Sequence, residues 1–176
     1  DPHREGGFLL VHPAGDREIL SAVLYIEPFS EQTRDNFGYD IDSEPVRREA
    51  MNRARDSGEA ALSGKLVLTQ GTDEAKLPGF LIYLPIYRKG LPLKTVDERR
   101  LALIGFVYSR FRADELMRGI FKDSRGDTEV EIFDGAPRPE NLLFASDNVL
   151  RVPRHVNEQP VSTAGHTWTA RFRSSP

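Results

Sequence analysis

Short apolar segments separated by polar turns recur along the whole chain, and this pattern predicts a β-rich fold. Two segments, Phe80–Tyr87 (FLIYLPIY) and Leu101–Tyr108 (LALIGFVY), are apolar enough to form a long hairpin in a core. Pro85 predicts an edge or a bulge in the first of them, because proline cannot donate to a sheet ladder. Shorter strands are predicted at Phe8–Val11, Ser21–Ile26, Lys65–Gln70, Glu129–Phe133, Asn141–Ala145, Asn148–Val152 and His166–Phe172.

Turns and connections are predicted between these segments. The first two short strands flank the polar turn HPAGDREI, which predicts a hairpin. Gly71–Lys76 is polar and predicts a loop, and Lys89–Arg100 predicts a charged connection between the two long apolar segments. Asp134-Gly135 ends a strand and is typical of a turn.

A helix is predicted after an aromatic turn (FGY), because Val46, Ala50 and Ala54 recur at helical spacing. Ser43 is the expected N-cap, and Gly58 is expected to end the helix with a positive φ. Acidic and basic residues four apart support its exposed face. The residues allow either an ordinary surface helix or a helix that covers a pocket.

A second amphipathic helix is predicted at Ala113–Phe121, with acidic residues in its first turn. Its expected buried residues are Leu116, Met117, Ile120 and Phe121. Together the elements predict an α+β fold with a larger unit over 1–112, a connecting helix at 113–122 and a smaller β-rich unit over 123–176.

Composition narrows the function classes. The 176 residues are 39% hydrophobic and 29% charged, which is typical of a globular protein, and the net charge of −3 gives no reason to expect nucleic acid as a partner. No apolar run approaches the 18 or so residues that a membrane helix needs. The chain has no cysteine, which excludes disulfides and thiolate metal sites.

Signatures of catalysis are missing from the sequence, which contains no GxSxG, P-loop, GxGxxG or HExxH. His3, His12, His155 and His166 are far apart and predict surface or turn residues, not a metal site. Asp134 allows a catalytic acid, but the turn is the favoured interpretation. We expect no enzyme activity, no cofactor and no metal in this chain.

Binding is better supported than catalysis. Aromatic residues on the two long apolar strands, Tyr83, Phe106 and Tyr108, are typical of a pocket wall, and pockets add a few placed polar groups. Arg47 and Arg110 could be such groups, because guanidinium favours carboxylate and phosphate. The alternative is that the aromatic residues are ordinary core and that both arginines are solvated.

Three stretches resemble the CHASE domain, the extracytoplasmic sensor module first described in plant cytokinin receptors. They are GYDIDSEPVRREAMNRARDSGEAALSG, GFLIYLPIY and ERRLALIGFVYSRFRADELMRGIF. The late AGHTWTARFRSSP is similar to the end of the family's membrane-proximal unit. The resemblance covers about Phe8 to Pro176 in the family's order and spacing. The family's long N-terminal helix and flanking membrane helices are missing, so we expect an excised part of a longer protein.

The resemblance implies two PAS-like subdomains joined by a helix. We expect 1–112 to be the membrane-distal, ligand-binding subdomain and 123–176 the membrane-proximal one. The resemblance further implies the periplasmic side of the inner membrane, in a histidine kinase or diguanylate cyclase whose catalytic output domain lies outside this chain. A homodimer is expected in the full-length receptor.

The resemblance also assigns pocket positions. The plant receptors hold a purine with an acidic residue on the helix before the RAR motif, and Arg47 stands at that position. Tyr83 matches their threonine, Phe106 their aromatic residue, and Ser109 and Arg110 the small residues that follow. Guanidinium has no acceptor for adenine N–H groups, which argues against a purine ligand here.

We therefore expect a small anionic ligand, held by one or both arginines. The expected ligand-binding residues are Arg47, Met51, Leu68, Tyr83, Phe106, Ser109 and Arg110. Two alternatives stay open: a degenerate pocket in a sensor that responds to a periplasmic protein partner, and a soluble hydrolase with an unrecognised site.

Overall fold

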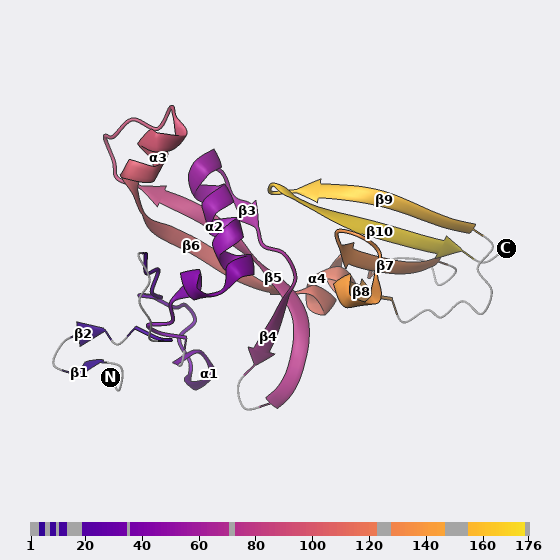
Figure 1. The fold of residues 1–176 in the computed structure, drawn as a ribbon. Coiled ribbons are helices and arrows are strands. Elements are labelled where there is room, and N and C mark those ends of the chain that lie inside the picture. Colours follow the sequence, from indigo (N-terminus) through magenta and orange to yellow (C-terminus); the bar gives the residue numbers. More distant parts are fainter. Residues whose placement is uncertain are drawn as a thin grey trace.

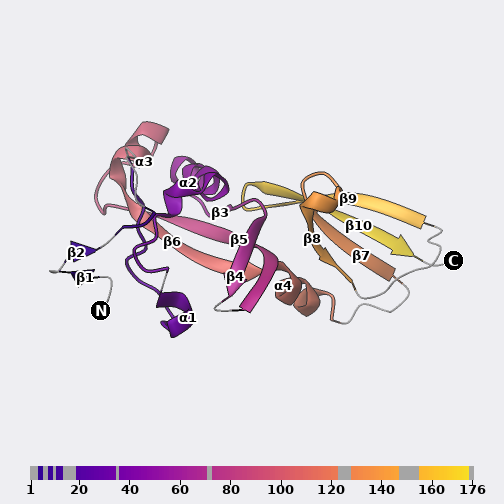
Figure 2. The same ribbon diagram turned by 60° about the horizontal axis from the view of Figure 1, so that its bottom comes forward.

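Two four-stranded antiparallel sheets, a separate two-stranded sheet and a few short helices make up the described part of the computed structural model (Figure 1). It describes residues 4–5, 8–9, 11–13, 19–34, 36–70, 73–122, 128–146 and 155–174. The α+β class is confirmed, and the sheets are compatible with PAS-like folds. Figure 2 shows the two sheets side by side with the short helix α4 between them.

The first sheet is built around one long strand. It consists of β3 (Ala61–Leu62), β4 (Leu66–Gln70), β5 (Asp73–Tyr87) and β6 (Leu103–Arg112). β3 and β4 follow one side of β5, and β6 pairs with its other side. The expected pairing of the two long apolar segments is therefore confirmed. Pro85 pairs with Phe106 of β6, and within the described residues no strand pairs with it on the opposite side of β5. This position agrees with the preference of proline for places where the ladder is incomplete.

Helix α2 (Pro45–Ser57) covers one face of this sheet with Ala50, Met51 and Ala54. The expected Ser43 cap is wrong: the free N–H groups of Val46 and Arg47 donate hydrogen bonds to the Glu44 carboxylate. Ser43 instead belongs to the short helix η1 (Ile41–Ser43) and donates to the carbonyl oxygen of Asp40. Gly58 ends α2 at φ 81°, as predicted.

The N-terminal part differs from the expected hairpin. β2 (Phe8–Leu9) pairs with β1 (Arg4–Glu5), whereas Ala22 forms a single bridge with Asp40. A short helix, α1 (Glu31–Arg34), follows. Long-range contacts with the turn before α2 therefore replaced the local pairing that the turn signal predicted.

Two further element boundaries were predicted incorrectly. β5 already begins at Asp73, inside the stretch expected to be a loop. The connection before β6 contains a helix, α3 (Val96–Ala102), so the second long apolar segment starts as helix. Thr95 and Glu98 form a capping box there, a signal that apolar periodicity does not contain.

Helix α4 (Ala113–Ile120) leads to the second sheet, as predicted. It buries Met117, but Ile120 is exposed, contrary to the expected stripe. The sheet has the order β8–β7–β10–β9, with β7 at Thr128–Asp134, β8 at Leu142–Ala145, β9 at His155–Thr163 and β10 at His166–Ser174. The mostly polar β9 was missed, and the strand expected at 148–152 lies outside the described residues. A short helix, η2 (Pro139–Asn141), precedes β8.

The buried apolar residues that the structure describes form two clusters, and one of these clusters contains residues of both sheets. Phe80 of β5 stacks on Phe111 and meets the edge of Trp168 from β10, with ring centroids 4.9 Å apart in the latter pair. Hydrogen bonds add to this contact: Leu62 N–H donates to the carbonyl oxygen of Ala164 at 2.9 Å, and Lys65 N–H donates to Asp134 at 2.7 Å. Because packing is shared, the unit boundaries drawn from the sequence stay a prediction.

None of the helices in the described ranges is long and apolar enough to cross a membrane.

Candidate functional site

A large cleft lies between the first sheet and the N-terminal part of the chain. One wall is formed by β6 residues 103–110 together with side chains of α2, and the opposite wall is the extended segment Ile19–Pro28. The cleft has a volume of about 1110 Å³, and apolar and polar groups both line it. Such a mixed lining is typical of ligand sites.

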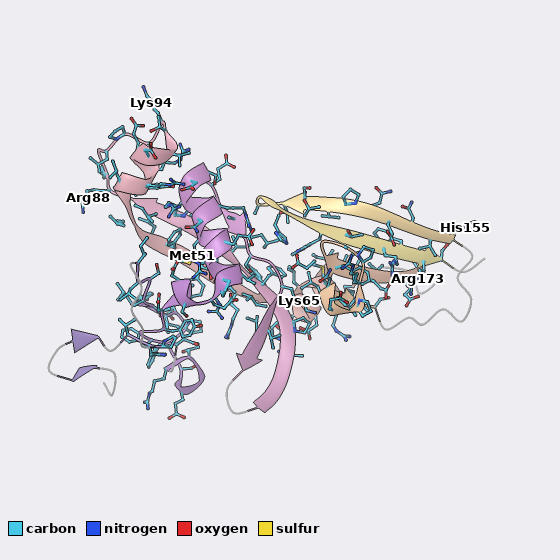
Figure 3. The ribbon with its side chains drawn as sticks, in the orientation of Figure 1. Met51, Lys65, Arg88, Lys94, His155 and Arg173 are labelled. Atoms are coloured by element: carbon cyan, nitrogen blue, oxygen red, sulfur yellow. The ribbon has the colours of Figure 1, made fainter. Side chains whose placement is uncertain are left out.

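Most of the expected binding residues meet at this cleft. Its lining includes Arg47, Met51, Leu68, Phe106, Ser109 and Arg110. Met51, marked in Figure 3, comes from α2, whereas Phe106 and Arg110 come from β6. The structure thus brings residues together that are more than fifty positions apart in the sequence. Their role as ligand contacts stays a prediction.

Among the expected ligand-binding residues, Tyr83 does not line the cleft but lies behind its wall. Its side chain is 0% exposed and packs against two residues of the wall, Phe106 and Tyr108, with centroids 6.3 and 5.6 Å away. Its hydroxyl is buried without a hydrogen-bond partner in the described part of the chain. Burial raises the pKa of Tyr83, and the positive charge of Arg47 opposes this shift, so the phenol is neutral at physiological pH.

Arg47 has the most unusual environment at the cleft. Its guanidinium carbon lies 5.3 Å from the ring centroid of Tyr39, a cation–π contact. Its Nε is buried and has no acceptor within the described residues. Neither Arg47 nor Arg110 forms an ion pair with a carboxylate in the ranges that the structure covers. A buried donor without an acceptor costs free energy unless a ligand supplies one.

The positive charges of both arginines affect the pKa of Tyr108. Burial raises the pKa of Tyr108, and the charges of Arg47 and Arg110 both act against the shift. Both positive charges therefore act on this one ring, which lines the cleft together with them. The site combines two unpaired cations with neutral phenols, which suits an anion with an apolar body.

Sequence reasoning missed several parts of the site. Tyr39, which holds Arg47, was recognised as part of an aromatic turn but not as a binding residue. The whole wall Ile19–Pro28 was missed, because its residues were interpreted as a paired strand. The residues Leu24 and Tyr25, both well exposed in the structure, give no signal that distinguishes a cleft wall from a strand.

Acids with shifted pKa values lie elsewhere. Hydrogen bonds from Arg100 and Arg55 lower the pKa of Asp56 at the end of α2. Burial opposes ionisation of Asp134, but hydrogen bonds from His166 and from the Lys65 amide outweigh it and lower its pKa. Within the described residues no group of three or more His, Cys, Asp or Glu side chains could hold a metal ion.

Comparison with known protein families now adds to this geometry. Residues 3–144 match the CHASE domain. The chain belongs to the CHASE family. The resemblance seen in the sequence is thereby confirmed over these residues, whereas the late AGHTWTARFRSSP lies outside the match and its assignment stays a prediction. The matched part contains the cleft, both arginines and the whole first sheet.

One curated relative of this CHASE domain is hybrid signal transduction histidine kinase A of Dictyostelium discoideum. It is 26% identical over an alignment of 145 residues, and the alignment covers 77% of this chain and 7% of the relative. The chain thus spans a small part of the protein that it matches. Together, the family and this relative support a sensory domain of a signalling receptor.

Proposed function

We propose that this CHASE domain senses a small anionic ligand on the periplasmic side of the inner membrane. It belongs, in this proposal, to a membrane-bound receptor whose catalytic output domain is a histidine kinase or a diguanylate cyclase. The family match and the histidine kinase relative support the sensory role. The type of output, the location and the ligand go beyond them.

The observation that carries the ligand class is the pair of unpaired arginines at the cleft. Arg47 Nε is buried without an acceptor, and Arg110 has no carboxylate partner in the described part of the chain. Proteins rarely leave a buried donor such as Arg47 Nε unmatched, because desolvation of an unpaired polar group is costly. Arg110 is exposed and carries no such cost. A carboxylate or phosphate would accept from both groups and would remove the cost at Arg47.

Signalling requires that the ligand bind two arrangements of the domain with different affinity. In the proposal the membrane-distal unit, residues 1–112, binds the ligand between the wall formed by β6 and α2 and the opposite segment Ile19–Pro28. A small shift then passes through α4 and the shared core at Phe80 and Trp168 to the membrane-proximal unit. A homodimer of the full-length receptor would deliver this change to paired output domains.

A thermal-shift screen tests the proposal. We expect small carboxylates or phosphates to raise the melting temperature of the domain, and we expect Arg47→Ala and Arg110→Ala each to reduce or abolish the shift. Lys94→Ala is the matched control, because Lys94 is an exposed cation away from the cleft (Figure 3). Stabilisation by purines but not by anions would contradict the proposed ligand class.

A protein partner is the second candidate signal. Leu91, Leu93 and Leu101 are exposed near α3, an apolar surface that fits a protein contact. It ranks behind the small ligand because the cleft is open and holds unpaired cations. If no small anion shifts the melting temperature, the protein partner becomes the favoured proposal.

A further inference from the structure

The connection between β5 and β6 forms a tip at one end of the first sheet. The tip consists of residues 88–101, which include most of α3, and it lies at the end of the sheet away from α4 and the second sheet (Figure 1). Arg88 N–H donates to the carbonyl oxygen of Ala102 at 2.8 Å, which closes the connection at its base. Every residue from 88 to 97 is exposed, and no residue of the tip lines the cleft. The tip is therefore a surface separate from the cleft.

Hydrogen bonds fix the conformation of this tip. The Glu98 carboxylate accepts from the N–H group of Lys94 at 2.6 Å. Arg99 donates from Nη1 to the carbonyl oxygen of Leu93 at 2.8 Å and from Nε to the carbonyl oxygen of Asp56, on α2, at 2.8 Å. Because the tip is already ordered and attached to α2, a partner that binds it spends little free energy on ordering the loop.

Apolar side chains stay at the surface of this ordered tip. Leu91 and Leu93 are 43% and 39% exposed. On α3, Val96 is 38% exposed and Leu101 is 84% exposed. Single exposed apolar residues are ordinary, but several that gather on one projecting element are typical of an interaction surface.

The tip is also positively charged. It contains five basic and two acidic residues, although the whole chain has a net charge of −3. Arg100 is neutralised by Asp56 at 2.7 Å. The exposed side chains of Arg88, Lys89 and Lys94 have no carboxylate partner in the described part of the chain. Figure 3 shows Arg88 and Lys94 at this same end of the sheet. The charge complement of the tip is an acidic partner.

A protein segment fits these observations better than a lipid surface does. Membrane-binding elements bury apolar side chains below the lipid headgroups, whereas more than half the surface of Leu91, Leu93 and Val96 is already covered within the fold. In the proposal that the second sheet is the membrane-proximal unit, the tip also points away from the membrane. The tip is smaller than the roughly 20–30 residues that each side of a standard protein interface uses, so a short segment suits it.

We propose that the tip binds a short acidic segment of a partner protein that also carries apolar side chains. Lys89 and Lys94 bind carboxylates of this segment, and Leu91 and Leu93, which lie between the two lysines in the sequence, pack against its apolar side chains. The inference goes beyond the proposed function, because the tip recognises its partner independently of the small anion in the cleft. It also specifies the chemistry of the protein partner that is the second candidate signal.

A defined peptide tests the inference. The probe is the heptapeptide Glu-Glu-Leu-Phe-Glu-Glu-Leu, acetylated and amidated at its ends, and binding is followed by the amide chemical shifts of the isotope-labelled chain. We expect the signals of residues 88–101 to move, and we expect added salt to weaken binding. Replacing the glutamates of the peptide by lysine, or its apolar residues by serine, should each weaken binding at least about tenfold.

Two double variants of the tip assign the contacts. Lys89→Glu with Lys94→Glu reverses the free charges and should weaken binding of the heptapeptide at least about tenfold. Leu91→Ser with Leu93→Ser removes the apolar contact and should weaken it by a similar factor, about tenfold. All four side chains are exposed, so circular dichroism of both variants should match that of the wild type.

A matched control separates the tip from general electrostatic attraction. Lys122→Glu with Arg138→Glu makes the same change of charge at exposed residues away from the tip, and it should change the affinity by less than about twofold. Asp97→Asn removes the exposed acid of the tip and should strengthen binding.

Each remaining outcome would overturn the inference. No binding of the heptapeptide, or an equal loss in the Lys122 and Arg138 control, would remove specific recognition by the tip. Chemical-shift changes at Arg47 and Arg110 in place of the tip would show that the peptide binds in the cleft. Binding to vesicles of phosphatidylglycerol and phosphatidylcholine without binding of the heptapeptide would replace the protein partner by a lipid surface. Anion sensing by the cleft is tested separately by the thermal-shift screen and does not fail with the tip.

Discussion

The two sheets use arginine in opposite ways. In the second sheet Arg171 lies between Glu131 and Glu158, with N···O distances of 3.3 and 2.8 Å. Arg173 beside it contacts Glu129 and Glu131 at 3.5 and 3.0 Å. At the cleft of the first sheet, by contrast, Arg47 and Arg110 have no carboxylate partner in the described part of the chain.

This difference separates stabilising charges from functional ones. Cross-strand ion pairs with several partners hold β7, β9 and β10 together, so these arginines have carboxylate partners within the fold. An arginine with a buried, unmatched Nε gives no such support to the fold, so stability alone does not explain Arg47. Sites that depart from good local pairing are expected where a protein functions.

The largest expected effect concerns the core that the two sheets share. Phe80→Ala removes the ring between Phe111 and Trp168 and should lower the free energy of unfolding by about 3–5 kcal/mol. Urea denaturation followed by tryptophan fluorescence and by far-ultraviolet circular dichroism measures it. Leu84→Ala, on an exposed position of the same strand, is the control. Two well-separated transitions in the wild type would show that the sheets unfold independently and that the shared core matters little.

Loss of a paired arginine should have the next largest effect. Arg171→Met leaves Glu131 with fewer partners and removes the contact with the Phe133 ring, so we expect a loss of about 1–2 kcal/mol. Chemical denaturation at low and high salt measures it. Arg138→Met, an exposed arginine of the same unit, should change stability by less than about 0.5 kcal/mol. Equal effects of the two substitutions would remove the contrast between the sheets.

We expect the free energy of unfolding to depend on pH through Asp134, which lies at the junction of the two sheets. Its folded pKa lies below its ordinary value, so its contribution to stability is present above that ordinary value and is lost as the pH falls through the folded pKa. Asp134→Asn should cost about 1 kcal/mol at pH 7 and progressively less below about pH 4. Unfolding curves between pH 7 and pH 3 measure this. A constant difference between variant and wild type would contradict the role of the ionised carboxylate.

The smallest effect is expected at the cleft. Arg47→Met should change the stability of the ligand-free domain by less than about 0.5 kcal/mol, because the lost contact with Tyr39 is offset by removal of the unpaired Nε. Chemical denaturation without ligand, beside the Arg171→Met variant, makes the comparison direct. A loss as large as that of Arg171→Met would show that Arg47 is a structural residue.

Local patterns predicted the parts of the fold in which local and long-range preferences agree. The apolar runs of β5 and β6, the helix before Gly58 and the strands β7 and β10 were all recognised, because each has a clear period or a clear end. The Ser43 cap failed because Glu44 competes for the same amides. The N-terminal hairpin failed because Ser21 and Val23 find better partners in the turn before α2.

The sequence by itself determined the fold class, the family and which residue types were available for a binding site. Aromatic and arginine residues on α2, β5 and β6 followed from periodicity and from the resemblance. Tertiary structure alone decided that Tyr83 lies behind the wall and that, among the described residues, Arg47 and Arg110 have no carboxylate partner. The physical reason is that the pairing and burial of a side chain depend on all its neighbours in space, whereas sequence periodicity shows only which face of one helix or strand is apolar.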